Sequence, residues 1–353
     1  MMKWFGLCLV STLLLSALAS QVDAGMRLTE SGTLSSLEAI VIRPHLAAAA
    51  DTAQKLSDSV SRMCETKDAA SFSEARGAWK NANAAWLKTA PFRFGPAAGL
   101  ERRLDKPVHD IVLEASVNDV AMKHLWKNQD ARGYSAAEYL LFTPPNVAAA
   151  TSVARCEHMK DVTAEIAHLT NQVNREWNSG YGKEFVAAGD GKPFLVAGDV
   201  LSLVLASMLN GTETLLRDGI GIPGGLFGSD EKPKLLRGWY SDTCGESFLA
   251  SLDGLDQALS AGKSSSVLEL AATRNGVLYC GDPKLVAGIR KQITKTRKVI
   301  GSAADKGLMR NAEPKKRKQA LGSVYKEFQK LQDQLVELSL ILELDVRTTD
   351  EKQ

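Results

Sequence analysis

Hydrophobic residues recur at helical spacing along most of this 353-residue chain. Leu34, Leu37 and Val41 begin one stripe, which continues through an alanine-rich run to Met63. Alanine is abundant, and the alternation of β-branched residues that is typical of strands is not found in clusters. The pattern therefore predicts an all-α fold.

Two more segments predict amphipathic helices. Ser71 followed three residues later by Glu74 has the form of a capping box, so we expect a helix to begin there. Trp79 and Trp86 lie on its apolar face, which predicts that both are core residues. Another stripe, from Met159 to Trp177, predicts a long helix.

A heptad pattern marks the last helix. The apolar residues that repeat every seven positions, and those between them, are Leu321, Phe328, Leu335 and Leu342, with Val324, Leu331 and Leu338. Such a pattern suits a dimeric coiled coil or one helix of an antiparallel bundle. We favour the bundle helix.

The N-terminus has the features of a secretory signal peptide. Lys3 precedes an apolar run over residues 7–19, and small residues follow at the spacing that a signal peptidase requires. The run is shorter than the ~20 residues that span a bilayer. Asp199 and Glu337 interrupt the later apolar segments. We therefore expect residues 1–24 to be removed, leaving a soluble exported protein with no transmembrane helix.

Charge and cysteine content narrow the class further. The formal net charge is +2 and is unchanged by cleavage, because one lysine and one aspartate leave together, which gives no case for nucleic acid. Four cysteines remain after cleavage: Cys64, Cys156, Cys244 and Cys280. An even number in an exported chain favours disulfides, and three pairings are open. We expect two bridges, one in each half.

A glycine-rich stretch from Ser179 to Pro193 divides the chain. It predicts an N-terminal helical bundle over residues 25–185 and a C-terminal bundle over residues 186–353. Irregular stretches at 88–110, 128–146 and 219–233 are long enough to carry function.

Common catalytic signatures are missing from the sequence. It contains no H-E-x-x-H, no G-x-S-x-G, no phosphate loop and no G-x-G-x-x-G, which disfavours standard zinc peptidases, serine hydrolases and nucleotide enzymes. Glu165 and His168 form a single Glu-x-x-His pair, whereas di-iron bundles need two. One pair is more typical of an exposed helix face.

The segment from Gly133 to Phe142 is more informative. A glycine precedes a short aromatic and aliphatic helix that carries Glu138, and Pro144 and Pro145 follow it. Composition favours a surface or first-turn glutamate, since first turns attract acidic residues. The other interpretation is a carboxylate presented by a rigid helix for function.

Several segments, taken in order, resemble the imelysin family of bacterial exported proteins. They are Cys64, Ala75–Trp79, Ala85–Trp86, Phe92–Pro96, Gly133–Phe142, Arg155–Cys156 and Gly245–Ser247. The resemblance implies two helical, four-helix-type bundles related by an approximate two-fold, with a ligand site between them. Its components in this chain would be Arg93, Ser135, Glu138 and Glu246.

One departure from the family pattern bears on chemistry. The family motif is G-x-H-x-x-E, and here Gly133 and Glu138 occupy its ends while Ser135 stands at the histidine position. A serine hydroxyl is a poor ligand for a transition metal, and metal-dependent peptide hydrolysis needs about three protein ligands and a water. Glu138 remains a candidate metal ligand, and a substitute for the missing histidine could come from His109, from Asp110 or from the second half of the chain.

Arg93 has two interpretations, a surface ion pair or a fork that holds an anionic ligand. Together with the resemblance, these residues predict a periplasmic binding or accessory protein in the acquisition of iron or another divalent metal. Its partners would be a metal ion or small ligand and other envelope uptake proteins. The alternatives are an exported metallopeptidase of the imelysin type and a scaffold that binds a protein.

Overall fold

The structure is a computed structural model that describes residues 29–107, 131–189, 194–274 and 278–346. Helices are the only regular elements within these ranges, and no β-strand occurs in them, so the all-α prediction is confirmed. The predicted signal peptide, His109 and Asp110 lie outside the described residues.

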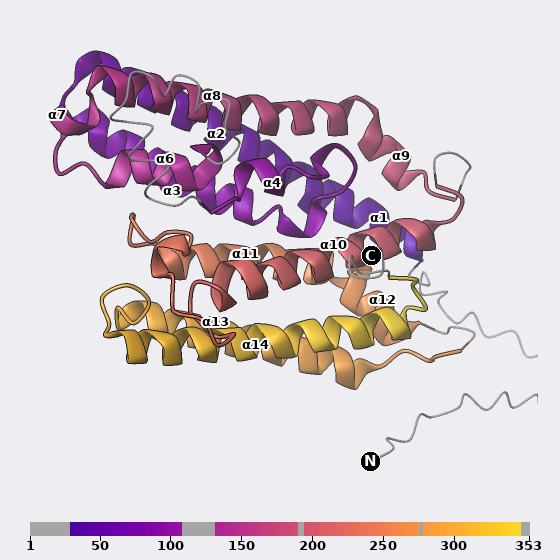
Figure 1. Cartoon of the computed structure of the whole chain (residues 1–353). Coiled ribbons are helices and arrows are strands. Elements are labelled where there is room, and N and C mark those ends of the chain that lie inside the picture. Colours follow the sequence, from indigo (N-terminus) through magenta and orange to yellow (C-terminus); the bar gives the residue numbers. More distant parts are fainter. Residues whose placement is uncertain (1–28, 108–130, 190–193, 275–277, 347–353) are drawn as a thin grey trace, which may run out of the picture.

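The helices are arranged in two layers (Figure 1). The first layer is built on α2, α3 and α8, with α6 packed against α3 and α8. The elements in chain order up to this point are α1 (Glu30–Leu37), η1 (Glu38–Ile42), α2 (Arg43–Thr66), α3 (Ala69–Leu87), η2 (Ala90–Phe92), η3 (Gly95–Ala97), α4 (Glu101–Leu104), α6 (Gly133–Phe142), α7 (Val147–Ala150), α8 (Val153–Glu176), η6 (Trp177–Tyr181) and α9 (Gly182–Val186).

The second layer contains α10, α11, α13 and α14 (Figure 1). In it α13 packs on both α11 and α14, and α10 packs on α14. Its elements are α10 (Ala197–Thr214), η7 (Leu215–Gly221), η8 (Pro233–Leu235), α11 (Cys244–Ser260), η9 (Lys263–Ser265), α12 (Val267–Thr273), α13 (Pro283–Asp305) and α14 (Pro314–Ile341). The two layers meet where α3 packs against α11.

The periodic segments form the helices that their spacing predicts. The first stripe becomes α1, η1 and α2 without a break, and the stripe that ends at Trp177 becomes α8 and the start of η6. The heptad segment becomes α14, which packs within the second layer as a bundle helix.

The start of α3 differs from the capping-box prediction. The helix begins at Ala69, and the carboxylate of Asp68 accepts a hydrogen bond from the Ser71 N–H at 2.8 Å. Ser71 therefore lies inside the first turn. Aspartate caps as well as serine does, so the sequence offers two candidates three residues apart, and the earlier one is used.

Two clusters of buried apolar residues form the core. The first contains Trp79 and Trp86, which confirms that these tryptophans are core residues. The second is built mainly from α10 to α14, but Leu34 of α1 and Trp177 of η6 also belong to it. The N-terminal helix therefore packs into the second core. The domain boundary near residue 186 and the two-fold relation between bundles stay predictions.

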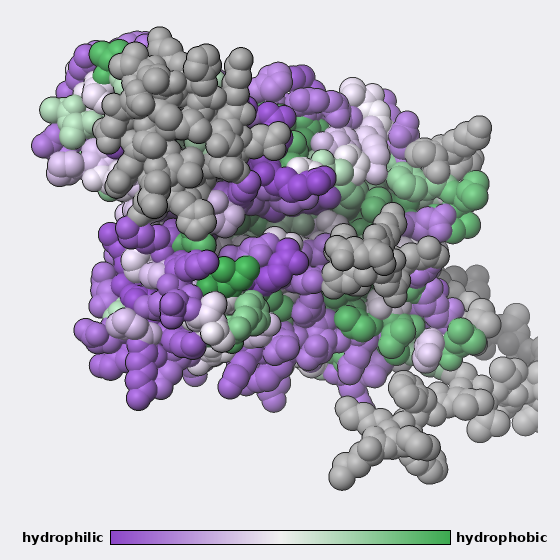
Figure 2. All heavy atoms as spheres, in the orientation of Figure 1, coloured by the Kyte–Doolittle hydropathy of each residue, from purple (hydrophilic) through white to green (hydrophobic). Residues whose placement is uncertain are grey.

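The outer surface is mostly polar on the face drawn in Figure 2, where hydrophobic residues gather only in small groups. Among the described helices, none combines the length and apolar content that a membrane span requires.

One of the two expected disulfides is present. Cys64 of α2 and Cys156 of α8 are bonded across 92 positions of sequence. Cys244 instead keeps a free thiol, so the predicted bridge involving it in the second half is wrong. Cys244 is a buried member of the second hydrophobic cluster, where its thiol packs as a small apolar group. The physical reason is that a bridge needs a second cysteine at bonding geometry, which Cys64 finds in Cys156 and Cys244 lacks among the described residues.

Candidate functional site

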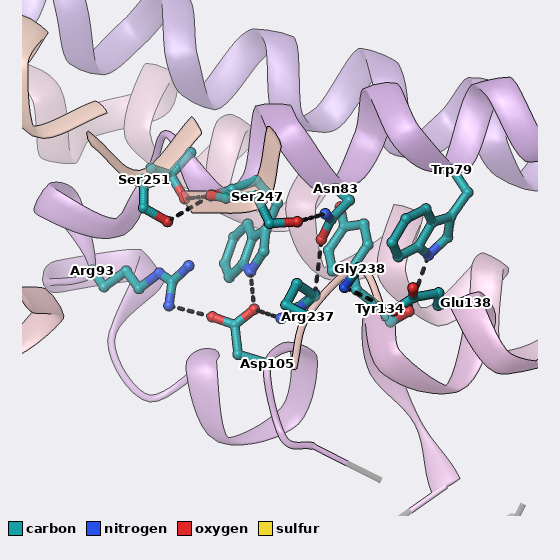
Figure 3. Close-up of polar contacts among 12 residues, drawn as sticks. Trp79, Asn83, Arg93, Asp105, Tyr134, Glu138, Arg237, Gly238, Ser247 and Ser251 are labelled. Carbon is teal, nitrogen blue, oxygen red and sulfur yellow. Dashed lines mark hydrogen bonds and ion pairs between the residues drawn. The ribbon is translucent and has the colours of Figure 1, made fainter. Parts of the chain in front are cut away.

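Asp105 lies between two arginines at the contact of the two layers (Figure 3). Its carboxylate pairs with Arg93 through one oxygen and with Arg237 through the other. Arg93 directly follows η2, Asp105 ends α4, and Arg237 comes two residues after η8. All three side chains are mostly buried, with exposed fractions of 12%, 16% and 11%.

Local turns aim the two arginines at Asp105. The backbone N–H of Arg93 donates to Ser207 Oγ of α10 at 3.1 Å, which fixes the turn after η2. Gly238 follows Arg237 with φ +87, and a Cβ there would lie 2.5 Å from the carbonyl carbon of Thr243. Only glycine fits this left-handed, closely packed position.

Aromatic rings line the ion pairs. Trp86 donates its indole N–H to Asp105 Oδ1 at 2.7 Å, and its ring lies 4.7 Å below the Arg93 guanidinium. The Arg237 guanidinium lies 5.5 Å over the ring of Tyr134, which stacks on Trp86 with centroids 6.3 Å apart. Burial alone would raise the pKa of Asp105, but the charges of Arg93 and Arg237 hold that pKa below its usual value.

A second polar link joins α3 to the later part of the chain. Asn83 accepts from Arg237 Nη1 at 3.0 Å and donates to Ser247 Oγ of α11 at 3.2 Å (Figure 3). Asn83 is buried, and both its amide oxygen and its amide nitrogen have hydrogen-bond partners inside the protein.

Glu138 lies close to this cluster and is held by three donors. Its carboxylate accepts from the Gly238 N–H at 3.2 Å, the Ser241 N–H at 2.9 Å and the Ser241 hydroxyl at 2.8 Å. Only 2% of the residue is exposed, so the surface or first-turn interpretation is wrong. Burial raises the pKa of Glu138 despite these donors.

The beginning of α6 places Tyr134 beside Asp105. Gly133 has φ +76, and a Cβ there would lie 2.6 Å from the Leu104 carbonyl oxygen, so α6 starts directly against the end of α4. Trp79 donates its indole N–H to the Tyr134 carbonyl at 3.0 Å. The family-motif glycine therefore has a packing role in this chain.

Three donor atoms of the cluster have no partner in the described structure. They are Arg93 Nε, Arg93 Nη2 and the Tyr134 hydroxyl, all of them inaccessible to solvent. Two guanidinium groups also pair with the one carboxylate of Asp105, so these ion pairs contain one more positive than negative charge. This arrangement can accept an anion.

The described residues do not fit a bare metal ion held by the chain. Nowhere in the described ranges do three or more His, Cys, Asp or Glu side chains come together as a metal-binding group. Both Glu138 oxygens face N–H or O–H donors. Glu165, of the Glu-x-x-His pair, instead pairs with Arg103 and Arg132.

The structure brings together two of the four residues expected at the site. They are Arg93 and Glu138. Arg93 and Arg237 both pair with Asp105, and Gly238, the residue after Arg237, donates to Glu138. Ser135 is half-buried on α6, and Glu246 is exposed in the first turn of α11. Neither takes part in the contacts described above.

Sequence reasoning missed Asp105, Tyr134 and Arg237. Asp105 lies in the irregular stretch over residues 88–110, which length alone marks as a candidate. Arg237 begins the aromatic and polar run Arg237–Thr243, just before the family-like segment at 245–247. This run could have indicated Arg237 as a site residue, but nothing in it indicates that Arg237 pairs with Asp105.

The fold and the site define an all-α protein of two helical layers with a buried arginine and carboxylate cluster at their contact. The family model for imelysin matches residues 42–340, so the chain belongs to the imelysin family. No curated protein is significantly similar to it.

Two solved structures share the fold. One is described as a "putative iron-regulated protein A precursor" from Parabacteroides distasonis ATCC 8503. It is 16% identical, with 90% of this chain and 97% of that chain covered and a TM-score of 0.73. The other is an imelysin-like protein from Psychrobacter arcticum 273-4, 15% identical, with 90% and 96% covered and a TM-score of 0.66.

Proposed function

We propose that this imelysin-family protein is an exported binding or accessory protein in the acquisition of iron or another metal. Its ligand would bind where the two helical layers meet. The observation that carries the proposal is the convergence of Arg93, Asp105 and Arg237, from opposite halves of the chain, on one buried polar cluster.

Unmatched donors support a binding role for this cluster. A buried donor without a partner costs free energy, and native proteins leave few of them. Three such atoms lie within the cluster, on Arg93 and Tyr134. A site prepared for a ligand explains why they are concentrated there.

The link to metal comes from a relative. The structure from Parabacteroides distasonis is described as an iron-regulated protein A precursor, with the same fold across 90% of this chain. Regulation by iron fits a protein that serves iron supply, and we extend that role to this chain. The sequence prediction of an exported protein is consistent with it.

The proposal is tested on the untagged mature protein. Bound iron, zinc and copper are measured after purification, and binding of Fe³⁺, Fe²⁺ and Zn²⁺, each as a salt and as a citrate complex, is followed by calorimetry. We expect at least one form of one metal to bind at a ratio near one to one.

The same preparation separates the peptidase alternative. The protein is incubated with oxidised insulin chain, with and without a chelator. Chelator-sensitive cleavage that is lost in Glu138→Ala would establish a metallopeptidase instead. If no metal binds in any form and no cleavage occurs, the metal-acquisition proposal is wrong.

A further inference from the structure

Arg93 uses only one side of its guanidinium group. Nη1 pairs with Asp105, while Nε and Nη2 are buried and have no partner in the described structure. The N–H bonds of Nε and Nη2 point the same way and form a planar, two-pronged edge. The free edge is therefore the bidentate one.

Other arginines of this protein show what that edge binds. Arg43 donates from Nε and Nη2 to the two oxygens of Glu38, at 2.8 and 2.6 Å. Arg317 donates from the same two nitrogens to the two oxygens of Glu231, at 3.1 and 2.7 Å. In each pair the two nitrogens match the two oxygens of a carboxylate. The corresponding edge of Arg93 lacks its carboxylate.

Tyr134 provides a second and independent observation. Its residue is fully buried, and its hydroxyl has no partner in the described part of the chain. Its ring lies beneath the Arg237 guanidinium and stacks on Trp86, and the Arg93 guanidinium also lies over the Trp86 ring. The positive charges of Arg237 and Arg93 both act on this hydroxyl, so it can donate to an oxyanion that the two groups attract.

The charges of the cluster favour one added negative charge. Both carboxylate oxygens of Asp105 have partners, since Oδ2 pairs with Arg93 and Oδ1 accepts from Arg237 and Trp86. Two guanidinium charges pair with this single carboxylate, and a buried charge without a counter-charge is costly. The other carboxyl group near Arg237, that of Glu138, bonds to Gly238 and Ser241, and burial raises its pKa, which favours its neutral form. One carboxylate group of an organic anion would balance these ion pairs.

We propose that Arg93 and Tyr134 bind the carboxylate of a small organic anion, with Arg237 balancing its charge. This inference rests on the proposed function, since it places the ligand at the same contact between layers. It adds that the metal arrives as an anionic carboxylate complex, which requires no cluster of metal ligands on the chain. Arg93 Nε and Nη2 are inaccessible to solvent, so the segments of this protein that pack around them must move slightly to admit the ligand.

The experiment measures binding of citrate, ferric citrate and inorganic phosphate to the mature protein by calorimetry. Arg93→Lys keeps the charge beside Asp105 but removes the two-pronged edge. Tyr134→Phe removes a hydroxyl that bonds to nothing in the described structure, so its folding stability should be unchanged. Arg317→Lys is the matched control, because its edge already holds Glu231.

We expect citrate to bind the parent protein and to bind about tenfold or more weakly in Arg93→Lys and in Tyr134→Phe. The control should retain the parent affinity. Equal citrate affinity in all four proteins, or no citrate binding, would overturn the inference. Phosphate binding with this variant dependence and without citrate binding would also overturn it.

The outcomes also separate the inference from the proposed function. Citrate binding that depends on Arg93, with no binding of ferric citrate or of any metal salt, would keep the carboxylate site and reject metal acquisition. Metal-salt binding that is unaffected by either variant, together with no citrate binding that depends on Arg93, would keep metal acquisition and reject the carboxylate site.

Discussion

Ser241 donates two hydrogen bonds to Glu138, a residue 103 positions earlier in the chain. The bonds come from its backbone N–H and its hydroxyl, and the hydroxyl also lies 2.7 Å from Thr243 Oγ1. Gly238 of the same segment donates to the other Glu138 oxygen. The family-motif glutamate thus fastens the segment that carries Arg237 onto α6.

This role predicts a distinctive pH dependence of stability. The pKa of Glu138 is raised in the folded protein, so between its ordinary value, about 4.5, and the raised value the folded chain binds more protons than the unfolded chain. The free energy of unfolding must therefore fall as pH rises through this range. In Glu138→Gln that part of the dependence should vanish.

The measurement is urea unfolding of both proteins from pH 4.5 to pH 8. We expect the stability advantage of the parent over Glu138→Gln to shrink steadily as pH rises. A constant difference across the range would show that Glu138 keeps the same protonation in both states and would refute the prediction.

Asp105 predicts the opposite behaviour in a separate pH range. The pKa of Asp105 is lowered, so its stabilising contribution is fully present above about pH 3.8 and is lost as pH falls through the folded value. At neutral pH, Asp105→Asn would leave Arg93 and Arg237 buried without their counter-charge. We expect it to lower the free energy of unfolding by about 3–5 kcal/mol.

Asp51→Asn is the matched control for Asp105→Asn. Asp51 pairs with Lys55 on an exposed helix face, and such pairs contribute about 0.3–0.5 kcal/mol. Denaturant unfolding at pH 7 and pH 3 checks both variants. If Asp105→Asn costs no more than the control at pH 7, Asp105 is not the counter-charge that stabilises Arg93 and Arg237 inside the protein.

Gly133 allows a test of the motif glycine on packing grounds. With φ +76 and the Leu104 carbonyl oxygen 2.6 Å from a built Cβ, Gly133→Ala should destabilise the protein by about 2 kcal/mol or more. Gly77 is exposed within α3 and has no atom near its Cβ position. Gly77→Ala should therefore stabilise by about 0.5–1 kcal/mol. Thermal unfolding compares the two, and equal effects would contradict this account.

The helices were predictable because each buries one face along its length. The spacing of Leu34, Leu37 and Val41, or of the heptad residues before Leu342, records that burial directly in the sequence. Termini were less predictable, as Asp68 and Ser71 show, because two good capping residues lie within one turn. The choice between them depends on packing that the local sequence does not contain.

The site was predictable only in part. Arg93 and Glu138 were found through a family resemblance, whereas Asp105 and Arg237 are 132 positions apart and carry no periodic signal. Their pairing depends on the contact between the two helical layers, which is a tertiary property. The predicted disulfide of Cys244 is wrong for a similar reason. Even cysteine numbers suggest pairing, but the tertiary fold decides whether a second cysteine lies close enough to bond.

The disulfide and the free thiol give the last prediction. Cys64 and Cys156 close a loop of about a hundred residues, so replacing both by alanine should lower the free energy of unfolding by about 2–5 kcal/mol. Burial raises the pKa of the Cys244 thiol, which suppresses the reactive thiolate. A thiol reagent should therefore label Cys244 only after unfolding in urea without reductant. Urea unfolding of the double variant checks the first point, and peptide mapping without reduction checks the second. A peptide that links Cys244 to Cys280 would contradict the second.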